Sequence, residues 1–295
     1  ILSGLVGSEM CIRDSKSDQL VSLTTNQIVA LNTSQVQALT TAQLQSLTPP
    51  QIASMELVDI SSMTGQQVAA LQTGQIQALT SSQVASLTTT QVFSLTVDGF
   101  AALKTSQIQA LTTSQIVAMT AAQFAVMTTV QVQALTPSQV NALTTAQLSS
   151  LTTDVITTLT TAQLNVLTSD QVQALTVGEV QALKPSQIAG LTTGQIAAFT
   201  TDQLASLNTS QIQALTTAQL VSLKSGQIQA LATNEIASLT TSQIASLQTS
   251  QIQALTVPQV VALTTAQVQA LTTGQINSLT STQLASVSYT HLRAH

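Results

Sequence analysis

The stretch Thr216-Thr217-Ala218-Gln219-Leu220-Val221-Ser222-Leu223 decides the fold, because almost every other octapeptide of the chain is a variant of it. We describe each residue by the remainder that its number leaves on division by eight. Thr216 then lies at the cap position (remainder 0), Gln219 at the glutamine position (3) and Leu220 at the first core position (4). Ser222 lies at the small position (6) and Leu223 at the second core position (7).

The octapeptide keeps its phase along the array without an insertion or a deletion. The first core position is Ile, Val, Leu or Phe in all 34 units from Leu20 to Leu284, and the second is Leu, Met, Phe or Val. Glutamine occupies its position in 29 of the 34 units. A fixed short period is typical of a solenoid, in which each unit buries its apolar face against its neighbours.

The spacing of the two core positions favours helices. Residues three apart lie on one face of a helix. They cannot belong to one long helix, because the apolar stripe would rotate by about 80° per octapeptide at 3.6 residues per turn. The many Thr, Ile and Val residues are typical of strands, so a parallel β-solenoid with the leucine at a corner is the alternative.

Capping signals decide between the two. Thr216 followed by Gln219 has the form of a capping box, in which each side chain bonds to the backbone N–H of the other residue. Prolines occupy the first turn, as Pro137 and Pro185 do. Acidic residues gather near the expected helix starts, and Lys104, Lys184 and Lys224 follow the preceding leucine, where they would complement the end of the preceding helix. We therefore predict an all-α solenoid of 34 helices, each about 6–7 residues long.

The small position bears on how the helices stack. It is almost always Ala or Ser, with the exceptions Val126, Thr158, Val166 and Gly190. Small side chains let neighbouring helices approach closely. We expect three helices of about 10 Å to close each triangular coil of the rod, with two helices per coil as the alternative.

Both ends of the chain depart from the repeat. Residues 1–15 read ILSGLVGSEMCIRDS, and the chain ends VSYTHLRAH from Val287. Both ends resemble translated sequencing-adapter read-through, so we treat 1–15 and 289–295 as flanks and 16–288 as one continuous array. The flanks contain the only Cys, both His, both Arg and the only Tyr of the chain: Cys11, His291, His295, Arg13, Arg293 and Tyr289.

The array lacks the residues that most catalytic sites need. Residues 16–288 hold no Cys, His or Arg, and their acids are scattered singly. The sequence therefore offers no nucleophile–base pair, no carboxylate pair and no metal-ligand cluster. We predict no catalytic, cofactor-binding or metal-binding residue and no enzymatic activity. The net charge of −5 without a basic patch argues against nucleic acid, and no apolar run is long enough for a transmembrane helix.

Two resemblances add to this interpretation. Leu183-Lys184-Pro185-Ser186-Gln187-Ile188 resembles the opening of the first helix in TAL-effector repeats. The second helix and the base-reading loop of those repeats are absent, so the resemblance does not imply DNA binding. The whole array is similar to low-complexity repeat regions of large bacterial secreted or surface proteins, which implies an extracellular or cell-surface location.

Two functions remain open from the sequence. The first is a structural spacer or stalk in a larger bacterial surface or secreted protein. The second is a binding module whose Thr, Ser and Gln faces contact glycan, mineral or ice, although Lys, Asn and Gln at some cap positions interrupt the threonines. For the glutamine column itself we expect a structural role, in which the amide caps its own helix and bridges to a stacked carbonyl.

Overall fold

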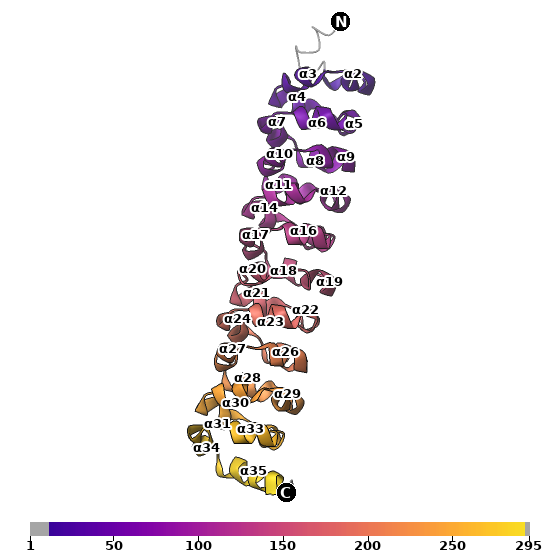
Figure 1. Cartoon of the computed structure of the whole chain (residues 1–295). Helices are drawn as coiled ribbons and strands as arrows, with labels where there is room; N and C mark the ends of the chain where they lie inside the picture. Colours follow the sequence, from indigo (N-terminus) through magenta and orange to yellow (C-terminus); the bar gives the residue numbers. More distant parts are fainter. Residues whose placement is uncertain (1–11, 293–295) are drawn as a thin grey trace. The chain divides into compact units, whose positions relative to one another are not determined.

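The computed structural model describes residues 12–292, with side chains up to residue 287. The chain divides into two compact units, Ile1–Leu151 and Thr152–His295, and each is described by itself. The described residues form 34 helices, α2–α35, and no strand (Figure 1). The prediction of an all-α repeat with one helix per octapeptide is therefore confirmed.

The helices of the first unit are α2 (Ser17–Val21), α3 (Thr25–Val29), α4 (Thr33–Ala38), α5 (Thr41–Ser46), α6 (Pro49–Ser54), α7 (Leu57–Ser62), α8 (Gly65–Ala70), α9 (Thr73–Ala78), α10 (Ser81–Ser86), α11 (Thr89–Ser94), α12 (Val97–Ala101), α13 (Thr105–Ala110), α14 (Thr113–Ala118), α15 (Ala121–Ala125), α16 (Thr129–Ala134), α17 (Pro137–Asn141) and α18 (Thr145–Leu148). Those of the second unit are α19 (Thr153–Ile156), α20 (Thr161–Leu164), α21 (Ser169–Ala174), α22 (Val177–Ala182), α23 (Pro185–Gly190), α24 (Thr193–Ala198), α25 (Thr201–Ala205), α26 (Thr209–Ala214), α27 (Thr217–Val221), α28 (Ser225–Ala230), α29 (Thr233–Ser238), α30 (Thr241–Ser246), α31 (Thr249–Ala254), α32 (Val257–Val261), α33 (Thr265–Ala270), α34 (Thr273–Ser278) and α35 (Ser281–Leu292).

Helix α27 shows how one octapeptide folds. Thr216 is its N-cap, with extended backbone, and the Gln219 N–H donates to the Thr216 hydroxyl over 3.2 Å. The Thr216 N–H in turn donates to Gln219 Oε1 over 2.7 Å. This capping box supplies partners for N–H groups that a short helix cannot satisfy by itself.

The corners between helices need no glycine. After α4, Leu39 leaves the helix with φ −61° and ψ 129°, and Thr40 follows with φ −71° and ψ 159° as the N-cap of α5. Two extended residues thus turn the chain, and no residue of the described range has a positive φ. Most helices span six residues and end at the small position, which agrees with the 6–7 predicted, and the others, except α35, end one or two residues earlier. The second core residue is needed for the corner.

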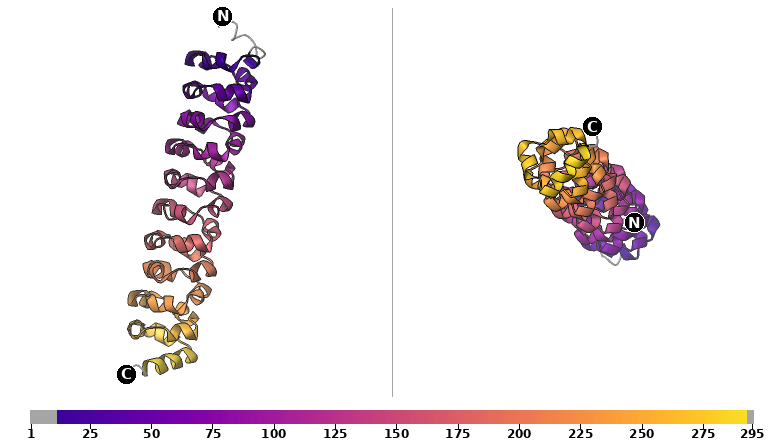
Figure 2. Two further views of the ribbon diagram at one scale, coloured as in Figure 1. Left: turned by 90° about the vertical axis from the view of Figure 1, so that its right-hand side faces the viewer. Right: turned by 90° about the horizontal axis from the view of Figure 1, so that it is seen from below.

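Helices stack three apart in each unit. In the first unit the stacked columns run α2–α5–α8–α11–α14–α17, α3–α6–α9–α12–α15–α18 and α4–α7–α10–α13–α16. In the second they run α19–α22–α25–α28–α31–α34, α20–α23–α26–α29–α32–α35 and α21–α24–α27–α30–α33. Each coil therefore contains three helices, as predicted, and the two-helix coil and the β-solenoid are wrong. The left view of Figure 2 shows successive layers of short helices within each unit.

The core consists of the side chains at the two core positions of the octapeptide. First-core residues from Leu20 to Val260 are at most 2% exposed. At the end of the second unit Ile276 and Leu284 are 43% and 48% exposed, because no further coil of the described chain covers them. Helix α35 continues beyond its octapeptide to Leu292. The 16–288 boundaries of the array stay a prediction.

Candidate functional site

The most regular chemical feature of the chain is its column of buried glutamines. Gln219 is 2% exposed, and its Nε2 donates to the carbonyl oxygens of Ile188 and Leu191 over 2.9 and 2.7 Å. These acceptors precede Gln219 by 31 and 28 residues and lie at the end of α23. Since α23 and α27 belong to successive coils, one amide joins the start of a helix to the end of a helix in the coil before.

The same bonds recur in both units. In the first unit, the Gln83 Nε2 donates to the carbonyl oxygens of Ile52 and Met55 over 3.0 and 2.8 Å. The carbonyl of the second core residue has no helical N–H to accept from, because it lies at the corner. The glutamine amide fills that need inside the solenoid. The column is thus a structural ladder, as the sequence predicted, and its amides are not exposed to a ligand.

Two further kinds of side-chain hydrogen bond join stacked helices. One comes from the small position and the other from the position before it. The Ser222 hydroxyl donates to the Gln219 carbonyl oxygen over 2.6 Å and to that of Thr193, in the stacked helix α24, over 3.1 Å. On the outside of the first unit, the Gln37 amide donates to the Ser62 carbonyl oxygen over 2.8 Å. That second link was not predicted from the sequence, since it depends on which helices stack.

Three acids replace glutamine and are buried: Asp59, Glu179 and Glu235 are 1%, 2% and 4% exposed. Burial raises the pKa of all three carboxyls, and Glu56 raises that of Asp59 further. Glu179 and Glu235 still cap their helices by accepting backbone N–H bonds from Thr176 and Ala232. The three acids lie on different helices, α7, α22 and α29, and the described residues contain no group of His, Cys, Asp or Glu that could hold a metal ion.

The sequence analysis expected the lysines to complement the end of the preceding helix, but the structure places them at the start of the next one. Lys104, Lys184 and Lys224 are each the N-cap of the following helix, and their side chains form no cap bond. Their backbone N–H groups still donate to the glutamine, as Lys104 does to Gln107 Oε1 over 2.7 Å. Only the backbone half of the cap is required, so a lysine is tolerated there.

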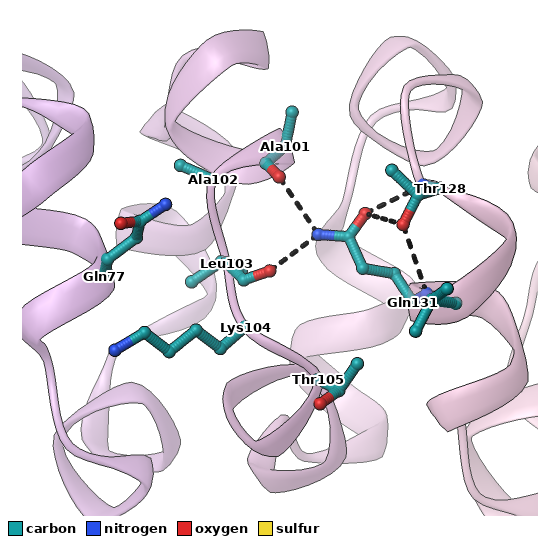
Figure 3. A pocket seen from close by; sticks show the side chains of 9 residues that line it. Gln77, Ala101, Ala102, Leu103, Lys104, Thr105, Thr128 and Gln131 are labelled. Carbon is teal, nitrogen blue, oxygen red and sulfur yellow. Dashed lines mark hydrogen bonds between the residues drawn. The ribbon is translucent and has the colours of Figure 1, made fainter.

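A surface pocket of about 390 Å³ lies beside Lys104 in the first unit. It is lined by Gln77, Ala101, Ala102, Leu103, Lys104, Thr105, Thr128, Val130 and Gln131. Figure 3 shows the Gln131 amide turned to the carbonyl oxygens of Ala101 and Leu103, at 3.1 and 2.7 Å. The ladder therefore uses Gln131, and Lys104 is the charged side chain of the pocket.

The columns also reveal a file of threonines that the sequence analysis missed. The cap residues of α21, α24, α27, α30 and α33 are all threonine and all exposed: Thr168, Thr192, Thr216, Thr240 and Thr264. The cap positions of the second unit that carry Lys, Asn, Ala or Gln all fall in the other two columns. An octapeptide alone cannot show this, because the file has a period of three octapeptides.

Three further predictions concern the flanking residues, membrane-spanning helices and enzymatic activity. Cys11, His295 and the side chains of Tyr289, His291 and Arg293 lie outside the described residues. Within the part of the chain that the structure describes, no helix is long and apolar enough to cross a membrane. That the chain has no enzymatic activity stays a prediction.

Comparisons with known proteins agree with the repeat. The sequence pattern of a family described as "ALTTAQ repeat" matches residues 16–49, 52–89, 92–129, 113–145, 140–177, 178–209, 201–233, 220–257 and 230–265. No curated protein matches the sequence.

Proposed function

The chain belongs to the ALTTAQ repeat family, and from that premise we propose that the array is a non-catalytic spacer or stalk in a larger bacterial surface or secreted protein. One observation carries this proposal. The buried glutamine ladder fixes each coil to the coil before through the backbone, as Gln219 does with Leu191. A unit built in this way gains length by adding coils, and each new coil repeats the same contacts.

The distribution of polar side chains between the interior and the surface also supports the spacer. The recurring glutamine of the octapeptide is buried and hydrogen-bonded inside the solenoid, as Gln83 and Gln219 show. The outer surface is dominated by Thr and Ser, with charged residues only 6% of the chain. A surface of this kind suits separation of two other parts of a protein better than recognition of a charged partner.

Replacement of the array in its full-length protein tests the spacer. An unrelated rigid repeat of equal length should preserve the activity of the parent protein, whereas deletion of successive coils should reduce it in steps. A matched control exchanges exposed threonines for serine without changing the length. If activity follows the sequence of the array and ignores its length, the spacer proposal fails.

The threonine file favours a second candidate, a binding module for glycan, mineral or ice. Thr192, Thr216 and Thr240 stack in one column, and neighbouring helices pack about 8–10 Å apart. Each of these three threonines is followed by another exposed threonine, as Thr216 is by Thr217. The file thus presents hydroxyl and methyl groups at a regular spacing, which suits a ligand that is itself periodic.

Asparagine substitutions separate binding from stability. Asn208 caps α26 through its Oδ1, which accepts the Gln211 N–H over 3.0 Å. Exchanging Thr192, Thr216 and Thr240 for asparagine should therefore keep the caps while removing the methyl groups. The matched control makes the same exchange at Thr176, Thr200 and Thr272 in the column of α22. Glycan-array binding or thermal hysteresis lost only in the first variant would support a binding module; absence of both in the unaltered chain would reject it.

A further inference from the structure

The glutamine ladder of the second unit has one constant bond. From Gln187 to Gln283, each glutamine Nε2 lies 2.6–2.9 Å from the carbonyl oxygen of the residue 28 positions earlier. Gln243 is typical, since its Oε1 accepts the Thr240 N–H and its Nε2 donates to the Leu215 carbonyl oxygen. One side of the amide must accept and the other side must donate.

Glu235 lies in this ladder between Gln227 and Gln243. Its Oε2 accepts the Ala232 N–H over 2.7 Å, which is the bond that a glutamine Oε1 makes. In a glutamine the other atom of this group is Nε2, which donates to the carbonyl oxygen of the residue 28 positions earlier, and for Glu235 that residue is Leu207. An ionised carboxylate has no proton to donate there, and it would face the negative end of the carbonyl dipole in a site that is 4% exposed.

Glu179 shows the same conflict directly. The Thr176 N–H donates to its Oε2 over 2.6 Å, while its Oε1 is buried and has no hydrogen-bond partner. It is the one buried side-chain polar atom without a partner in the part of the chain that the structure describes. A buried polar atom left unpaired costs about 1–3 kcal/mol, and more when it is charged.

Few charges surround the two carboxyls. The helices packed against α29 are α26 and α32, and neither contains a charged residue. The helices packed against α22 are α19 and α25, whose Asp154 and Asp202 are exposed. No cation on these helices can therefore compensate a negative charge on Glu179 or Glu235.

We propose that Glu179 and Glu235 are neutral carboxylic acids in the folded chain and that Glu235 donates its proton to the carbonyl oxygen of Leu207. The O–H group replaces the missing amide N–H, so the ladder of the second unit continues through an acid. On ionisation the O–H bond breaks, the proton goes to water, and the bond to Leu207 is replaced by repulsion. The packing of α22 and α29 is thus a pH-sensitive device within the second unit.

The direction of the pH effect follows from the titration of these groups. Burial raises the pKa of Glu179 and of Glu235 above the ordinary value of 4.5, and the cap bonds offset only part of the increase. Below pH 4.5 the acids are protonated in both the folded and the unfolded chain, and the stabilisation is complete. As the pH rises through the folded pKa the protons are lost, and the second unit becomes less stable.

Glutamine variants of the full chain test the proposal. Thermal unfolding should be followed from pH 4 to 8 for the unaltered chain, Glu179→Gln, Glu235→Gln and the double variant. Between pH 4.5 and the raised pKa, each carboxyl should increase the unfolding equilibrium constant by up to about tenfold per pH unit. The variants should lose this dependence one step at a time and should unfold at higher temperature at pH 7.

A charge control and a direct readout complete the test. Asp202→Asn removes the same charge from an exposed site, and it should leave the pH dependence unchanged. Carbon-13 NMR of labelled glutamate side chains should show two carboxyls with raised pKa values, each assigned by its loss in one variant. Ordinary titration of both carboxyls, or a double variant with the pH dependence of the unaltered chain, would overturn the proposal.

Discussion

The side chain of Gln219 joins two coils, because its Nε2 donates to the Leu191 carbonyl oxygen over 2.7 Å, 28 residues earlier in the chain. The Oε1 of the same side chain accepts the Thr216 N–H at the start of its own helix. A glutamate at this position can accept the N–H of its own helix at any pH. It can donate to the carbonyl oxygen of the coil before only when it is protonated. An apolar residue can do neither, which explains why glutamine recurs in 29 of 34 units.

Gln147→Leu should destabilise the first unit by about 2–4 kcal/mol, because two backbone groups lose their partners. They are the Thr144 N–H and the Met119 carbonyl oxygen, each 2.8 Å from the Gln147 amide. Urea unfolding followed by circular dichroism measures the loss. Gln147→Glu is the matched control and should be less harmful at pH 4 than at pH 8. Equal stability of the leucine variant and the unaltered chain would remove the structural role of the ladder.

Ala232→Thr should stabilise the second unit by about 1 kcal/mol, because it supplies a missing N-cap hydroxyl. Ala232 is the N-cap of α29 and forms no side-chain cap bond, whereas the Thr240 hydroxyl accepts the Gln243 N–H over 3.2 Å. Thermal unfolding of the variant gives the gain. The reverse change, Thr240→Ala, should cost a similar amount, and Thr240→Asn should be neutral. A stabilising effect of Thr240→Ala would contradict the cap assignment.

Much of this fold could be predicted from one octapeptide. The capping box of Thr216 and Gln219 and the three-residue spacing of Leu220 and Leu223 are local, and local geometry is what a sequence pattern reports. The end of the helix was harder to predict, because the second core residue, Leu223, both packs in the core and forms the corner. Its helix therefore ends at Val221, one or two residues earlier than expected.

The arrangement between coils could be predicted only in part. Close packing at the small position suggested stacking, but the pairing of Gln37 with Ser62, 25 residues later, follows only once three helices are known to form a coil. The threonine file has the same origin, since Thr192 and Thr216 are neighbours in space but three octapeptides apart in sequence. A nearly uniform repeat carries almost no signal about how many units close a coil.

Asp59→Gln should stabilise the first unit and should flatten its pH dependence. Burial, and then the neighbouring Glu56, raise the pKa of the Asp59 carboxyl above 3.8, so its folded form holds the proton more strongly than its unfolded form. The associated stabilisation is complete below pH 3.8 and is lost as the pH rises through the folded pKa. Thermal unfolding between pH 3 and 8 measures both effects.

A comparison of variants shows which part of Asp59→Gln matters. Asp59→Asn removes the charge, but its amide is one methylene shorter than that of glutamine. It should therefore flatten the pH dependence with a smaller gain in stability. Glu56→Gln, at the exposed N-cap of α7, should reduce the pH dependence only slightly. A larger effect of Glu56→Gln than of Asp59→Asn would show that repulsion, and not burial, raises the pKa.

Insertions of different lengths should separate the phase of the octapeptide from the size of the coil. Helices α24 and α27 stack directly and begin at Thr193 and Thr217, so one coil takes 24 residues. Duplication of 217–240 should therefore add a coil without loss of stability. Duplication of the single octapeptide 217–224 should also be tolerated, because each column offers the same cap, glutamine and core positions. Duplication of 217–220 should instead destabilise the second unit strongly, since every later core residue would leave the interior. Urea unfolding and small-angle X-ray scattering of the three variants decide the matter: a stable four-residue insertion would contradict the solenoid, and an unstable octapeptide insertion would show that the columns are not interchangeable.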